Sequence, residues 1–239
     1  MTPYWQSADG AITVYHARWE DVHAAGLVGE IDLTHADPPY GVNERTERAT
    51  NGRSNAAASI DFARVAGDDR PFDPAPLLAL DRPLVTWGAN HYSARLPDSP
   101  SWILWDKREG TTPDDNADGE AAWTNLGGPL RIFVHRWNGM IKASEKDSKR
   151  IGSTQKPIAL STYIFQRARL RAGALVFVPF LGSGPDLPAA LAMGLRVVAC
   201  DVSEECCRVA VGARLGAVAQ GRAQEPVGPL FGGTREAAK

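Results

Sequence analysis

The stretch Leu175-Val176-Phe177-Val178-Pro179-Phe180-Leu181-Gly182-Ser183-Gly184 is an apolar run that leads into a Gly-x-Gly turn. Three patterns follow it closely: a helix over Leu187–Met193, a strand over Arg196–Asp201 and a helix over Glu204–Leu215. The order strand, helix, strand, helix is typical of the nucleotide-binding half of a doubly wound α/β sheet. This stretch therefore decides the fold class that we predict for the chain.

The strand after the turn ends in Asp201, about 20 residues downstream, where an acidic side chain suits the hydroxyl groups of a ribose. A Gly-x-Gly turn alone is common in structural loops. Here it is more compact than Gly-x-Gly-x-x-Gly, and Pro185-Asp186 follows the second glycine. A nucleoside ligand without a pyrophosphate therefore fits the pattern better than a dinucleotide.

The rest of the chain alternates between short strand patterns and helical patterns, as expected for an α/β sheet. We expect one domain over residues 1–218, a mobile loop over 42–70 and a flexible tail over 219–239. A loop is expected between the strands predicted over Trp102–Trp105 and Arg131–Trp137. The predicted strands are Ile12–His16, Ile31–Ala36, Pro83–Trp87, Trp102–Trp105 and Arg131–Trp137, and the predicted helical segments are Trp19–Leu27, Leu77–Leu80 and Pro157–Leu170.

The composition is that of a globular protein, with 239 residues, 44% hydrophobic and 23% charged residues, and a net charge of −2. The start of the sequence has no signal-peptide pattern, and the longest apolar run, of about eight residues, is far shorter than a membrane span. Cys200, Cys206 and Cys207 lack the spacing of zinc ligands. We therefore expect no membrane contact and no metal, and the low net charge argues against a generally basic nucleic-acid coat.

The tetrapeptide Asp37-Pro38-Pro39-Tyr40 directly follows a predicted strand. One interpretation is structural: two prolines after a strand often do no more than turn the chain. The alternative is methyl transfer to an exocyclic amine, whose two N–H groups would be accepted by the Asp37 carboxylate and the Pro38 carbonyl. Pro39 restricts Pro38 to extended geometry and so fixes that carbonyl, and Tyr40 would stack on the base.

Three motifs occur in one order: Asp37 to Tyr40, then Thr154-Gln155-Lys156-Pro157, then Phe180 to Gly184. In this order they resemble the β-class site-specific amino-methyltransferases of DNA. The resemblance covers about residues 11–215 and includes Trp87-Gly88-Ala89-Asn90, Trp105-Asp106-Lys107-Arg108 and Arg136-Trp137-Asn138-Gly139. It implies a Rossmann-like class I methyltransferase sheet, mostly parallel with one antiparallel strand and a circularly permuted motif order. It also implies S-adenosylmethionine as cofactor and a cytoplasmic protein of a bacterium or phage that acts in restriction–modification.

The resemblance assigns site residues one by one. The residues implied in catalysis at the target base are Asp37, Pro38, Pro39 and Tyr40. Those implied in cofactor binding are Ala17, Ser153, Thr154, Lys156, Pro179, Phe180, Gly182, Ser183, Gly184, Asp201 and Val202. Lys156 and its neighbours would surround the methionine end of the cofactor, and Asp201 would hold the ribose.

The cofactor motifs depart from the family pattern at three places. Val178 replaces an acidic residue, Pro185-Asp186 replaces Thr-Thr, and Ala17-Arg18 replaces Gly-Asp. Asp186 is a candidate replacement for the missing carboxylate. A relative that binds DNA but has a weakened cofactor site and impaired catalysis is therefore an alternative.

The interval from Arg131 to Lys156 carries seven basic and two acidic residues. Beside these motifs, phosphate contact is the better interpretation of the excess positive charge. We expect double-stranded DNA as partner and a short recognition segment over 138–155, and a homodimer that shares recognition is a further hypothesis. The residues expected to contact DNA are Lys107, Arg136, Asn138, Lys142, Lys149 and Arg150.

The sequence therefore predicts an adenine-specific DNA methyltransferase that recognises a short double-stranded site and flips the target base. Asp-Pro-Pro-Tyr favours adenine among the enzymes it resembles, and the 4-amino group of cytosine remains the alternative base. Methyltransferases of RNA or of protein glutamine use a similar tetrapeptide, but there the glycine loop comes first, the reverse of the order here.

Overall fold

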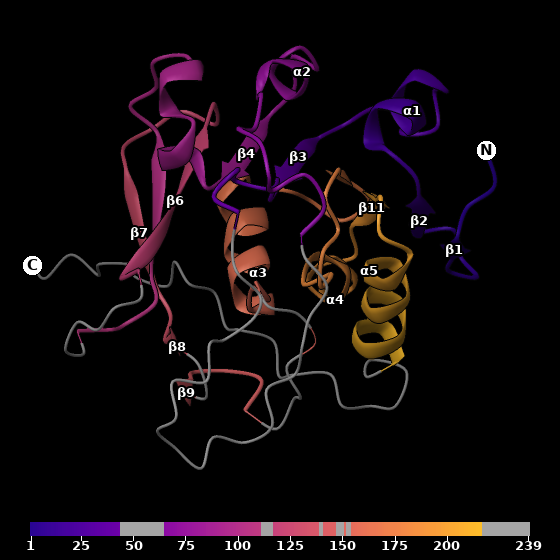
Figure 1. Ribbon diagram of the computed structural model, residues 1–239. Helices are drawn as coiled ribbons and strands as arrows, with labels where there is room; N and C mark the ends of the chain where they lie inside the picture. The colour runs from indigo at the N-terminus through magenta and orange to yellow at the C-terminus, as the bar shows by residue number, and fades with distance from the viewer. Residues whose placement is uncertain (44–64, 111–116, 139–140, 147–150, 152–153, 217–239) are drawn as a thin grey trace, which may run out of the picture.

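Strand β10 (Leu175–Val178), which leads into the Gly-x-Gly turn, lies in the middle of a mixed sheet. The computed structural model describes residues 1–43, 65–110, 117–138, 141–146, 151 and 154–216. In these residues nine strands form one sheet in the order β1-β2-β11-β10-β3-β4-β6-β5-β7 (Figure 1). The other strands of the sheet are β1 (Trp5–Gln6), β2 (Ile12–His16), β3 (Leu33–Ala36), β4 (Leu84–Trp87), β5 (Trp102–Asp106), β6 (Gly119–Thr124), β7 (Arg131–Val134) and β11 (Arg196–Asp201).

The pairing of β10 with β3 joins parts of the chain that are far apart in sequence. The two strands are parallel, with Val176 opposite Leu33 and Phe177 opposite Thr34, while β11 lies parallel on the other side of β10. Neighbouring strands of a sheet lie about 4.8 Å apart. The tetrapeptide after β3 and the glycine turn after β10 therefore leave the same edge of the sheet side by side.

The prediction of a mostly parallel α/β sheet is confirmed. Strand β6 runs antiparallel between β4 and β5, and the two-residue edge strand β1 also runs antiparallel to its neighbour. The predicted loop between the Trp102 and Arg131 strands is wrong for Gly119–Thr124, which form β6. This segment has the sequence Gly-Glu-Ala-Ala-Trp-Thr, whose first four residues have low strand propensity, so only pairing on both sides makes it a strand.

Helices cover both faces of the sheet (Figure 1). Helices α3 (Ile158–Arg167), α4 (Asp186–Ala192) and α5 (Glu204–Val209) lie on one face, and the short helices α1 (Trp19–Ala24) and α2 (Ala75–Leu78) lie on the other. Two apolar clusters fill the layers, one around Trp87 and Phe165 and one around Trp19 and Phe177. Burial on both faces explains why the central strand β10 is a continuous apolar run.

The ends of several elements differ from the sequence prediction. Helix α5 is followed by a π-helical segment, η3 (Ala210–Leu215), and α3 ends at Arg167 rather than Leu170. The short 3-10 helices η1 (Ala89–His91) and η2 (Ser93–Arg95) follow β4, and a separate two-stranded sheet consists of β8 (Trp137–Asn138) and β9 (Ile141–Lys142). Most of the predicted loop over 42–70, part of the segment over 138–155 and the tail over 219–239 lie outside the described residues. Within the described part, no helix has the length and apolar character needed to span a membrane.

A buried ion pair between Glu145 and Arg214 ties η3 to α3 and to the glycine turn. The Arg214 Nη1 to Glu145 Oε2 distance is 2.5 Å, and the two side chains are only 5% and 2% exposed. Arg214 Nε also donates to the Ser183 carbonyl at 3.0 Å, and the other Glu145 oxygen accepts the first backbone N–H of α3, from Ile158, at 2.8 Å. These hydrogen bonds satisfy the two buried charges and connect three elements.

We expect Glu145→Gln and Arg214→Met each to reduce the free energy of unfolding by about 3 kcal/mol, because each leaves a buried charge without its partner. The double variant Glu145→Gln/Arg214→Met is expected to lose less than the two single losses added together. Urea unfolding of the four proteins measures this coupling. Strictly additive losses would show that the two side chains do not stabilise the fold as a pair.

Candidate functional site

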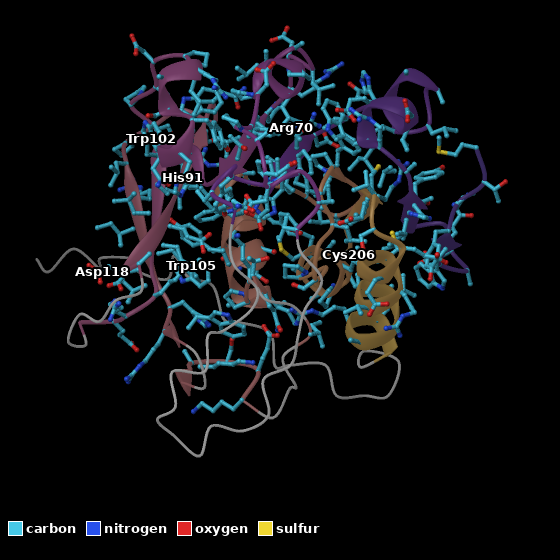
Figure 2. All side chains as sticks on the ribbon, viewed as in Figure 1. Arg70, His91, Trp102, Trp105, Asp118 and Cys206 are labelled. Carbon is cyan, nitrogen blue, oxygen red and sulfur yellow. The ribbon has the colours of Figure 1, made fainter. Side chains whose placement is uncertain are left out.

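The tetrapeptide lines a cavity of about 530 Å³ at the edge of the sheet where β3 ends. Asp37 and Tyr40 line it from one side, and Glu120 on β6 and Lys156 before α3 line it from others. Figure 2 shows two further lining residues, His91 and Trp105, near β6. The first and the second motif of the sequence therefore meet in one cavity, together with residues that the sequence did not assign.

Tyr40 is held by contacts on its ring and on its hydroxyl. The hydroxyl donates toward Asp37 Oδ1 at 2.7 Å and toward Glu120 Oε2 at 3.0 Å. The ring stacks on the His91 imidazole, with centroids 5.3 Å apart and an angle of 17° between the planes. Gly88 packs against the ring at φ +68°, and a Cβ atom there would lie 2.1 Å from ring carbons. Glycine is therefore required at position 88 for this placement of Tyr40.

The Lys156 ammonium lies at the Asp37 carboxylate rather than beside the glycine turn. Its Nζ donates to Asp37 Oδ2 at 2.5 Å and lies 3.0 Å from Glu120 Oε2, and its side chain is 7% exposed. Only its backbone approaches the turn, because Arg214 contacts both the Lys156 carbonyl and the Ser183 carbonyl. The predicted cofactor role of Lys156 stays a prediction, and its ammonium group lines the same cavity as Asp37.

Glu120 completes the charged cluster, and sequence reasoning missed it. Its second carboxylate oxygen forms a short ion pair with Lys107, whose ammonium lies over the Trp105 ring at 4.9 Å from the centroid. The residue lies on β6, opposite Trp105 in the pairing of β5 with β6. The sequence predicts a loop where β6 lies, so no pattern in it indicates a role for Glu120.

The pKa values of the cluster follow from burial and from its neighbours. Burial opposes the charge on Glu120, but Lys156 and Lys107 outweigh it and lower the pKa of Glu120 to about 2. Burial also opposes the charge on Lys156, but Asp37 and Glu120 raise its pKa well above the ordinary value. Burial and the two carboxylates raise the pKa of Tyr40, so its phenol keeps its proton. Glu120 and Lys156 are therefore ionised at neutral pH, and Tyr40 is a neutral donor.

A second cluster forms where β11, β10 and β2 end. Asp201 Oδ2 accepts the backbone N–H of Gly182 at 2.8 Å, and Oδ1 accepts that of Ser203 at 2.8 Å. The Asp201 carbonyl accepts the N–H of Ala17 at 2.9 Å, and His16 Nε2 lies 3.1 Å from the carbonyl of the exposed Val202. Burial raises the pKa of Asp201, against the opposing effect of the two backbone donors. Three of the predicted cofactor residues, Ala17, Gly182 and Asp201, are thus brought together.

This second cluster fits a nucleoside ligand. An ionised carboxylate offers about four acceptor positions, and the two backbone donors leave room for two hydroxyl groups of a ribose. Gly182 has φ +51°, and a Cβ atom built on it would meet no other atom within 4 Å, so open space adjoins the turn beside Asp201. The residues present therefore suit the cofactor that the sequence predicts.

The other predicted cofactor residues have mixed placements. Phe180 packs edge-on against Phe72, with ring centroids 5.9 Å apart, and Pro179 is buried at the start of the turn. Gly184 is buried, and a Cβ atom there would lie 2.6 Å from the Cβ of Ala210, so this glycine serves packing against η3. Thr154 is exposed at the target cavity, and Ser153 lies outside the described residues.

Asp186 does not take over as a cofactor carboxylate. It is 5% exposed, and its Oδ1 lies 2.6 Å from His35 Nδ1 inside the core. The Trp87 indole N–H donates to His35 Nε2 at 2.9 Å. An indole nitrogen is only a donor, so the His35 proton is on Nδ1 and points to Asp186. The interpretation of Asp186 as a replacement for the acid absent at Val178 is therefore wrong.

The residues predicted to contact DNA are only partly described. The ammonium of Lys107 lines the cavity and pairs with Glu120, and its predicted contact with DNA stays a prediction. Lys142, on β9, also lines the cavity, with its Nζ 4.8 Å from the centre of the Trp137 ring, and Arg136 is half-buried just before β8. Asn138 lies on β8, whereas Lys149 and Arg150 lie outside the described residues.

The cysteines are free thiols, and Cys200 and Cys207 are buried. Cys207 Sγ lies 4.0 Å from the Asp201 carbonyl. Cys206 lies on α5, on the other side of the view in Figure 2 from His91 and Trp105. Across the described ranges of the chain, no three His, Cys, Asp or Glu side chains are grouped so that they could hold a metal ion.

Comparison with known proteins identifies the fold. No family model matches the sequence, and no curated protein matches it. The crystal structure of an M1.HpyAVI–SAM complex is 17% identical, with a TM-score of 0.51, and the match covers 85% of this chain and 98% of that chain. The PvuII DNA methyltransferase, described as cytosine-N4-specific, is 12% identical, with a TM-score of 0.57 and 87% of each chain covered. This chain therefore has the fold of these proteins.

Proposed function

We propose that this protein is a DNA methyltransferase that transfers a methyl group from S-adenosylmethionine to the exocyclic amine of adenine. The observation that carries the proposal is the placement of the Asp37 cavity and the Asp201 cluster at the carboxyl ends of neighbouring parallel strands. The solved structures of the same fold agree with it, since one is a complex with SAM and the other is a DNA methyltransferase.

At the target base, the protein positions the amine and makes its nitrogen more nucleophilic. The Asp37 carboxylate and the Pro38 carbonyl each accept one N–H, which directs the nitrogen lone pair away from the ring. Pro38 is buried and Pro39 restricts it, so the carbonyl needs no reorganisation when the base enters. The surplus proton of the methylated amine passes to Asp37 and then to water.

At the cofactor, Asp201 holds the ribose hydroxyls and Gly182 lets the ligand approach the backbone. Ala17 and Val202 flank this carboxylate from β2 and from the residue after β11. When bound, S-adenosylmethionine supplies an electrophilic methyl group on a sulfonium, which becomes a neutral thioether. The parallel pairing of β3 with β10 supports this arrangement, because it brings the loops after the two strands to the same edge of the sheet.

In this proposal the duplex is contacted by basic residues of the interval from Arg131 to Lys156. Arg136, Lys142 and the predicted residues Lys149 and Arg150 supply phosphate contacts, and the base flips into the cavity beside Tyr40. One face of the Tyr40 ring is covered by His91, with ring centroids 5.3 Å apart. The choice of adenine rests on the tetrapeptide, and cytosine-N4 is the alternative that the fold relatives keep open.

Asp37→Ala is expected to lower methyl incorporation into DNA at least about 100-fold, because it removes a preorganised acceptor at the reacting nitrogen. The change is expected to leave S-adenosylmethionine affinity within twofold. Tritiated-methyl transfer to plasmid DNA measures the loss, and nucleoside mass spectrometry of the wild-type product distinguishes N6-methyladenine from N4-methylcytosine. Asp98→Ala, at an exposed aspartate, is the matched control. Undiminished incorporation by Asp37→Ala would contradict the mechanism.

Asp201→Ala is expected to weaken S-adenosylmethionine binding roughly 10- to 100-fold, because hydrogen bonds to a charged acceptor contribute about 1.5–3 kcal/mol. Calorimetric titration measures the affinity. The Asp201→Asn variant keeps one acceptor oxygen, and its affinity for S-adenosylmethionine is expected to lie between those of the wild type and Asp201→Ala. Asp37→Ala serves as the control for the opposite site. If the wild-type protein shows no binding, the alternative of a DNA-binding relative with an impaired cofactor site is correct instead.

A further inference from the structure

Both oxygens of the Asp37 carboxylate are already in use. Oδ1 accepts the Tyr40 hydroxyl at 2.7 Å, and Oδ2 accepts Lys156 Nζ at 2.5 Å. Under the proposed function, on which this inference rests, the target amine needs an acceptor position on the same carboxylate. A carboxylate offers about four acceptor positions, so the amine takes one beside these two donors, and a shift of the Tyr40 hydroxyl to another acceptor leaves more of Oδ1 to the amine.

Glu120 lies within hydrogen-bond distance of the same two donors. Its Oε2 is 3.0 Å from the Tyr40 hydroxyl and 3.0 Å from Lys156 Nζ. An ammonium has three protons and can serve both carboxylates at once, but a phenol has only one. The Tyr40 proton therefore points either to Asp37 or to Glu120, and the two acceptors are alternatives.

Lys107 orients the Glu120 carboxylate so that one of its oxygens can accept a hydrogen bond. It binds the other carboxylate oxygen, Oε1, so that Oε2 faces Tyr40 and Lys156. The side chain of Glu120 is 18% exposed, and Asp37, with 31%, is the more open of the two carboxylates. The amine of an entering base thus reaches Asp37, while Glu120 stays behind it.

We propose that Glu120 is a positioning residue that accepts the Tyr40 hydroxyl when the target amine binds Asp37. The hydroxyl turns from Oδ1 of Asp37 to Oε2 of Glu120, so no buried donor is left unpaired as the base enters. Lys156 bridges the two carboxylates throughout. No bond other than hydrogen bonds changes, and the tyrosine ring stays on His91.

Glu120→Gln tests this role, because its single amide oxygen cannot serve Lys107 on one side and the two donors on the other. The variant is expected to lower kcat about tenfold, since a neutral acceptor is weaker than a charged one. Its affinity for S-adenosylmethionine is expected to stay within twofold of wild type. Glu30→Gln, at an exposed glutamate, is the matched control and is expected to keep full activity.

The decisive comparison uses Tyr40→Phe, which keeps the ring and removes the hydroxyl. If Glu120 acts by receiving that hydroxyl, Glu120→Gln in the Tyr40→Phe background is expected to change kcat less than twofold. A merely structural or electrostatic role predicts the same tenfold loss in both backgrounds. Such an undiminished loss, or a Glu120→Gln protein with wild-type kcat, overturns the proposal.

A measurement without methyl transfer separates this inference from the proposed function. With 13C at Cζ of tyrosine, the Tyr40 resonance, assigned by its absence in Tyr40→Phe, reports whether the phenol donates a hydrogen bond. In Asp37→Ala the hydroxyl is expected to remain bonded, to Glu120, and in Asp37→Ala/Glu120→Gln the resonance is expected to shift toward that of a free phenol. Equal resonances in these two proteins refute the alternative acceptor, whereas a wild-type protein that methylates no DNA refutes only the proposed function.

Discussion

The parallel pairing of β3 with β10 is the constraint on which the candidate site depends. It joins residues that are more than 140 positions apart and aligns the carboxyl ends of the two strands. The tetrapeptide continues one of these ends, and the glycine turn continues the other. Because β11 lies on the far side of β10, Asp201 reaches the same edge. The two halves of the proposed reaction are thus neighbours because of sheet register, whatever the order of the motifs along the chain.

Charge balance is the second constraint at this edge. Asp37 and Glu120 supply two negative charges to the cavity, and Lys156 and Lys107 supply two positive ones. Charges withdrawn from water are tolerated only when they are paired and hydrogen-bonded, and here each has a partner. The balance leaves the neutral Tyr40 hydroxyl as the one member of the cluster whose single proton has two acceptors. This hydroxyl can therefore change its acceptor without leaving any charge of the cluster unpaired.

A series of hydrogen bonds through Trp87, His35 and Asp186 connects the core to the tetrapeptide after β3 and to the glycine turn after β10. His35 lies two residues before Asp37, and Asp186 lies two residues after Gly184. The hydrogen bond between His35 and Asp186 joins β3 to α4. The hydrogen bond from the Trp87 indole to His35 joins β4 to both. The imidazole satisfies both neighbours in one tautomer, so this buried polar group is fully hydrogen-bonded. The carboxylate of Asp186 is therefore bonded inside the core of this protein, between the sheet and α4.

The sequence by itself determined the elements whose signal is local. Apolar runs of four to six residues, as in β10 and β11, and the motifs directly after them need no distant partner to be recognised. Only the tertiary structure decided the position of β6 and hence of Glu120, because a weak strand sequence was made a strand by β4 and β5 on either side. It also decided that Lys156 binds Asp37 and that Asp186 binds His35. Lys156 and Asp186 each bind a partner more than 100 residues away in the sequence, and such a partner cannot be predicted from the residues next to them.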